Sequence, residues 1–127
     1  MMSIKTPLNQ VRGLGSAKEG TGHFWQQRAT AVALVPLSVW FLWAVPKNVG
    51  ASYEAVLAWL ASPVTAILLL LFIGTAFHHM KLGLQVVIED YFHTHGTKVA
   101  LLLLNSFVSY GLVAASAFAI LKISLGS

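Results

Sequence analysis

Three long runs of apolar residues, separated by short polar stretches, dominate this chain of 127 residues. We expect them to form helices at about residues 25–45, 63–90 and 98–121. A helix of about 20 residues crosses the ~30 Å hydrocarbon core of a bilayer, and it satisfies its backbone hydrogen bonds internally, as lipid requires. The sequence therefore predicts an all-α fold, an integral membrane bundle of three transmembrane helices.

The charged residues support a membrane location rather than a soluble fold. Only 9% of the residues are charged, whereas a soluble domain carries about 25%. The net charge of +4 lies at the ends of the apolar runs, where it anchors helices, so we expect the lipid bilayer as a partner and no nucleic acid. The chain has no cysteine, which excludes disulfides and thiolate ligands.

We divide the chain into a basic N-terminal arm, residues 1–24, and a three-helix transmembrane anchor domain, residues 25–127. The arm is polar and rich in glycine, so we expect little helix there and no cleavable signal peptide. Pro36 lies inside the first run, where a membrane helix tolerates it. Residues 53–60 are too few to span, so we expect them to lie along the interface.

Lysine and arginine predict the orientation. The arm together with Arg28 carries four of them, and residues 81–98 carry two more, whereas the opposite ends carry only Lys47 and Lys122. By the positive-inside rule the N-terminus and the loop at residues 89–98 are cytoplasmic, and the C-terminus is periplasmic. We therefore expect a multi-pass protein of a bacterial inner membrane.

Ionisable side chains in the second run are candidate functional groups, because such groups are costly inside a membrane. His79 and Gly83 lie one helical turn apart. An imidazole can ligate haem iron, and a glycine one turn away leaves room for the flat porphyrin. A hydrogen bond from His79 to a neighbouring helix is the simpler alternative. His78 points about 100° away, and we expect it to bond another helix or to lie at the interface.

The second run ends in Glu89, Asp90 and Tyr91, at the level of the lipid head groups. A tyrosine hydroxyl can donate to a quinone carbonyl oxygen, and a neighbouring carboxylate can orient it or relay a proton. An interfacial tyrosine beside ordinary loop acids is the alternative. His93 and His95 could bind a metal, but they lack acidic or thiol partners nearby, so we interpret them as exposed loop imidazoles.

Arg28 stands at the mouth of the first run. Its planar guanidinium suits a haem propionate or a lipid phosphate, and anchoring by the positive-inside rule explains it equally well.

Two stretches of the chain resemble a known family. One reads HMKLGLQ at residues 79–85 and continues to EDY at residues 89–91; the other reads RATA at residues 28–31, preceded by GHFW at residues 22–25. They resemble the hydrophobic membrane-anchor subunit of succinate dehydrogenase (complex II), the D-type or cytochrome b556 small subunit family. The resemblance extends over nearly the whole chain.

This resemblance implies a role for each candidate residue. His79 would be one axial ligand of a haem b, the second histidine coming from a partner anchor subunit. Arg28 would face the haem propionates, and Gly83 would pack against the porphyrin. Tyr91 would donate a hydrogen bond to ubiquinone, with Asp90 supporting that site. No firm role follows for the remaining histidines: His23, His78, His93 and His95.

The resemblance also implies partners and an overall reaction. A flavoprotein subunit and an iron–sulfur subunit would oxidise succinate and pass electrons to ubiquinone near the cytoplasmic face. This chain would hold them to the membrane and have no activity alone. The alternatives are a haem-free structural anchor or assembly protein, the anchor of a quinol:fumarate reductase, and a small transporter subunit that moves protons through its intramembrane histidines.

Overall fold

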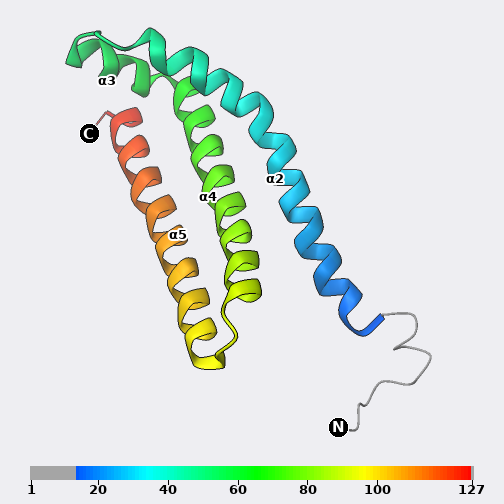
Figure 1. Ribbon diagram of the computed structural model, residues 1–127. Helices are drawn as coiled ribbons and strands as arrows, with labels where there is room; N and C mark the ends of the chain where they lie inside the picture. Colours follow the sequence, from blue (N-terminus) through cyan, green and yellow to red (C-terminus); the bar gives the residue numbers. More distant parts are fainter. Residues whose placement is uncertain (1–13, 127) are drawn as a thin grey trace, which may run out of the picture.

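The computed structural model describes residues 14–126 and folds this range into helices joined by short turns, without a strand (Figure 1). Three of these helices are long and apolar enough to cross a membrane, which confirms the expected all-α membrane fold. A fourth helix is formed by the stretch around residues 53–60, and it is too short to cross a membrane, as expected. The helices are α2 (Leu14–Lys47), α3 (Tyr53–Ala61), α4 (Pro63–Tyr91) and α5 (His95–Ser124).

The first helix begins earlier than expected. Residues 14–22 belong to α2, which corrects the expectation of little helix in that part of the arm; residues 1–13 lie outside the described residues. Once a long helix exists, each added residue gains a hydrogen bond without a new nucleation cost, and a glycine costs only about 1 kcal/mol. The same reason explains why α5 begins at His95, before the expected start of the third span.

Pro36 lies within α2 without ending it. Proline has no N–H group, so the bond to the carbonyl of Val32 is missing, and the ring pushes the preceding turn outward. Figure 1 shows α2 as one continuous, curved helix. The tolerance expected of a membrane helix for an internal proline is therefore confirmed.

Helix α4 is the central element. It packs against α2, α3 and α5, whereas the backbones of α2 and α5 do not approach each other closely in the described part of the chain. The turn formed by residues 92–94 returns the chain, so that α5 runs antiparallel beside α4 (Figure 1). The three long helices therefore form a layer in which both faces of α4 remain accessible between its neighbours.

The apolar core lies at the end of this layer that is next to α3. Ala66 and Leu69 of α4 are buried there with Ile120 of α5. Phe41 of α2 stacks on Phe72 of α4 with ring centroids 4.5 Å apart. Towards the other end of α4, α2 and α4 are joined through polar side chains, and the candidate site lies there.

Candidate cofactor-binding site between α2 and α4

His79 of α4 is hydrogen-bonded to Thr30 of α2. The distance from His79 Nδ1 to Thr30 Oγ1 is 2.9 Å. The single proton of the Thr30 hydroxyl is directed at its own helix, where Oγ1 lies 2.8 Å from the carbonyl oxygen of Gln26 and 3.0 Å from that of Gln27. Oγ1 therefore accepts from His79, and Nδ1 carries the proton. In a neutral imidazole this leaves Nε2 with an unshared electron pair, the form that ligates a metal.

Arg28 and His79 line the same hollow on one side of α2 and α4. The hollow measures about 260 Å³, and its other walls are Phe24, Gln27 and Ala31. The guanidinium carbon of Arg28 lies 5.6 Å from the centroid of the Phe24 ring, an arrangement that holds the cation near the hollow. The structure thus brings together two candidate residues that are distant in the sequence.

Gly83 leaves bare backbone beside this site. A Cβ atom added at Gly83 would meet only Gln27 Nε2, at 3.9 Å, which is an ordinary contact. Nothing among the described residues therefore requires glycine at this position. The missing side chain leaves open space at the surface of α4, one turn from His79.

His23 carries the one buried side-chain polar atom without a hydrogen-bond partner in the described part of the chain, its Nε2. The spacing of His23, Gln27 and Thr30 places them on one stripe of α2, and the last two contact α4. Sequence reasoning assigned no role to His23 or Thr30. The signal that could have identified them is this helical spacing, which becomes informative only once α4 is known to be the neighbour.

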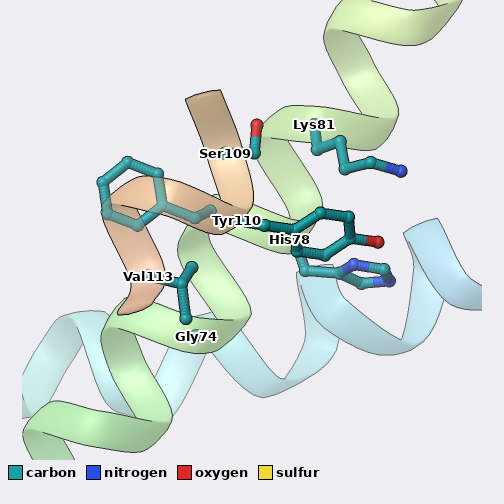
Figure 2. A pocket seen from close by; sticks show the side chains of 7 residues that line it. Gly74, His78, Lys81, Ser109, Tyr110 and Val113 are labelled. Atoms are coloured by element: carbon teal, nitrogen blue, oxygen red, sulfur yellow. The ribbon is translucent and has the colours of Figure 1, made fainter. Parts of the chain in front are cut away.

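His78 points away from this hollow. Its Nε2 lies 3.2 Å from Gln26 Oε1 of α2, and because that oxygen accepts, the imidazole donates. This contact confirms the expected interhelical hydrogen bond. His78 also lines a second hollow between α4 and α5, together with Lys81 and Tyr110 (Figure 2).

Asp90 and Tyr91 lie apart from the His79 site. They end α4, ~18 Å along the helix axis from His79 at about 1.5 Å per residue. Both are exposed, Tyr91 to 76%. Neither has a hydrogen bond or ion pair with the side chains of residues 21–126, and Asp90 is therefore not bonded to the Tyr91 hydroxyl.

His93 and His95 are exposed, as the sequence predicts. Among the described residues no group of three or more His, Asp or Glu side chains could hold a metal ion.

Three apolar helices, with an imidazole and a guanidinium facing one hollow between two of them, define a multi-pass helical membrane protein with a candidate cofactor site. Residues 2–113 match the family described as succinate dehydrogenase/fumarate reductase transmembrane subunit. The chain belongs to this family.

Curated relatives carry a consistent name. A succinate dehydrogenase hydrophobic membrane anchor subunit from Paracoccus denitrificans is 34% identical over 126 residues, which cover 99% of this chain and 97% of the relative. Proteins of the same name from Rickettsia bellii and Rickettsia conorii are 36% and 31% identical, covering 69% and 80% of this chain and 70% and 81% of those proteins. No solved structure gave a significant match.

Proposed function

We propose that this chain is a membrane-anchor subunit of succinate dehydrogenase and that Nε2 of His79 is one axial ligand of a b-type haem. The observation that carries this proposal is the hydrogen bond between His79 Nδ1 and Thr30 Oγ1. Ligating histidines commonly donate their second ring N–H to an oxygen, which fixes the tautomer and the ring orientation. A haem bound here would accept and release single electrons inside the membrane domain.

The residues around His79 fit such a group. Arg28 lies on the same hollow, and its guanidinium can pair with a propionate carboxylate. The unpartnered Nε2 of His23 offers a further polar contact on the same helix. The bare backbone at Gly83 leaves the space that a flat ring next to His79 needs.

The described residues supply one wall of the site, so a second membrane-anchor subunit would supply the other wall and the second axial histidine. The side chains on the outer faces of all three long helices are largely exposed apolar residues, which suits burial against lipid and against another membrane subunit. An iron–sulfur subunit and a flavoprotein subunit would dock on the cytoplasmic side, where the N-terminus and the turn at residues 92–94 lie in our proposal.

Tyr91 is our candidate contact for ubiquinone. Its exposed hydroxyl at the end of α4 can donate a hydrogen bond to a quinone carbonyl oxygen and stabilise the negative charge that develops there on reduction. Asp90 would support the site as a neighbouring proton acceptor, because its carboxylate is exposed next to Tyr91 in the sequence.

The haem proposal is tested by replacing adjacent histidines in the purified complex. His79→Ala removes the proposed ligand, and we expect the visible spectrum of the b-type haem to be lost or strongly changed. His78→Ala is the matched control, because it also removes an interhelical bond but leaves His79 intact. Mass spectrometry establishes that the anchor is present in each variant. An unchanged haem spectrum in His79→Ala would refute ligation and leave a haem-free anchor as the function.

A further inference from the structure

Lys81 is a cation within the membrane-spanning helix α4. Its ammonium nitrogen lies 5.3 Å from the centroid of the Tyr110 ring, and it forms no ion pair with the side chains of residues 21–126. The nearest acids along α4 are Glu89 and Asp90, ~12 Å further on at about 1.5 Å per residue. A cation in a membrane-spanning helix is a candidate for a functional contact, and an anion is the group that would neutralise it.

The depth of Lys81 in the membrane follows from helix lengths. Arg28 and Lys47 are ~28 Å apart along α2, and Pro63 and Lys81 are ~27 Å apart along α4, both close to the ~30 Å of a hydrocarbon core. The bond between Thr30 and His79 places Arg28 and Lys81 at the same level, because α2 and α4 are antiparallel. Lys81 therefore lies at the boundary between hydrocarbon and head groups, the level of lipid phosphates.

Polar groups of α4 and α5 gather at this level around the second hollow. It measures about 170 Å³ between α4 and α5, and Lys81, His78 and Tyr110 lie on its rim. In Figure 2 the ammonium, the imidazole and the phenol hydroxyl project to the same side. The hollow continues between apolar walls. They are formed by Gly74 and Phe77, which lie one to two turns closer to the middle of α4, and by Val113 of α5.

This hollow is on the other side of the layer from the His79 site. Lys81 follows His79 by two residues, and so points ~200° away from it around α4. The two hollows share no lining residue. A subunit that covered only the His79 face would leave the Lys81 face open to lipid.

We propose that the hollow between α4 and α5 binds a phospholipid, with its phosphodiester on Lys81 and Tyr110 and one acyl chain along Gly74, Phe77 and Val113. Basic pockets between membrane helices on the cytoplasmic side are suited to anionic head groups. The ammonium supplies charge, and the Tyr110 hydroxyl donates a hydrogen bond to a phosphate oxygen. A neutral quinone would leave the charge of Lys81 unpaired, so an anionic lipid fits better. The proposal does not depend on haem.

The test uses phosphatidylglycerol with a photoreactive acyl chain, added to the purified, delipidated complex. We expect labelling of the peptides that contain residues 74–81 and 109–113. Lys81→Gln should lower the labelling about fivefold, and Tyr110→Phe should lower it less, whereas Lys81→Arg should retain it. Lys47→Gln is the matched control, because it removes a boundary lysine whose Nζ also lies over an aromatic ring, that of Trp43 at 3.5 Å.

Three results would overturn the proposal. The first is equal labelling of these peptides in Lys81→Gln and Lys47→Gln. The second is displacement of the lipid by inorganic phosphate or by a short-chain quinone, which would indicate a site for a free anion or for a quinone. The third is no labelling of these peptides in the assembled wild-type complex, as expected if another subunit covers this face. If His79 ligates haem, the Lys81 and Tyr110 variants keep the haem content of the wild type. Haem content and lipid labelling therefore test the two proposals separately.

Discussion

Thr30 Oγ1 accepts a hydrogen bond from His79 Nδ1 over 2.9 Å, and this bond determines which imidazole nitrogen of His79 keeps its electron pair. The two residues come from different helices, α2 and α4. The bond lies away from the apolar core around Ala66 and Leu69, and it fixes the orientation of the ring relative to α2. Several measurable consequences follow from this arrangement and from the residues near it.

Thr30→Val should change the haem without removing its ligand. The variant keeps the shape of the side chain but removes the acceptor for Nδ1–H, so His79 becomes a weaker electron donor to iron. We expect a higher midpoint potential and a haem affinity lower by on the order of tenfold. Redox titration and the haem-to-protein ratio of the purified complex measure both. Thr30→Ser, which keeps the hydroxyl, should resemble the wild type; a valine variant with the wild-type potential would show that the bond has no such role.

Gly83→Leu should exclude haem while the chain still folds. A Cβ atom at this position meets only Gln27 Nε2 at 3.9 Å, so the side chain would project into the space proposed for the porphyrin. We expect most of the haem absorbance to be lost from a complex that still contains the anchor. Gly111→Leu is the control, because a Cβ atom at that position on α5 meets nothing within 4 Å. Retention of full haem content by Gly83→Leu would place the porphyrin elsewhere.

Tyr91→Phe should reduce electron transfer to quinone selectively. Loss of a hydrogen-bond donor to a developing oxyanion lowers rates by on the order of 100-fold. We expect succinate:quinone activity to fall while reduction of an artificial dye by the soluble subunits is unchanged. Tyr53→Phe, at an exposed residue at the start of α3, controls for the substitution itself. Equal loss of both activities would identify Tyr91 as an assembly residue.

Asn105→Leu should loosen the contact between α4 and α5. Asn105 Nδ2 donates to the carbonyl oxygen of Lys81 over 3.0 Å, and Ser109 Oγ donates to Asn105 Oδ1 over 3.5 Å. Interhelical bonds of this kind contribute about 0.6–1.7 kcal/mol in membrane proteins. We expect the free energy of unfolding in detergent to fall by that amount. Ser106→Ala, beside it on α5 and without a side-chain hydrogen bond to residues 21–126, should change the stability less.

Much of the fold could be predicted because its determinants are local. Apolar runs of sufficient length predict membrane helices wherever they occur, and the continuity of α2 through Pro36 follows from the same environment. The pairing of His79 with Gly83 is also local, since both lie on one helix at a spacing of one turn. The sequence could not predict that α2 would start at Leu14, because the propagation of a helix through glycines depends on the helix that follows.

The candidate site was only partly predictable, because it needs two helices to meet at a particular depth and rotation. Arg28 and His79 were separate candidates, and only the packing of α2 on α4 places them at one hollow. Tyr91 followed the same family pattern as His79, yet the length of α4 separates the two. His78 and Lys81 line the hollow on the other side of the layer, because the residues of a helix point in directions about 100° apart.

The sequence by itself determined that this chain forms three membrane-spanning helices and that an imidazole lies inside one of them. These outcomes follow from the transfer of contiguous apolar residues into lipid and from hydrogen bonds closed within each helix. Only the tertiary structure decided that Thr30 would be the partner of His79 and that Lys81 would face a separate hollow with Tyr110. Such contacts depend on how Trp40 and Phe41 of α2 and Ile120 of α5 pack against α4, which sets the rotation and level of all three helices at once.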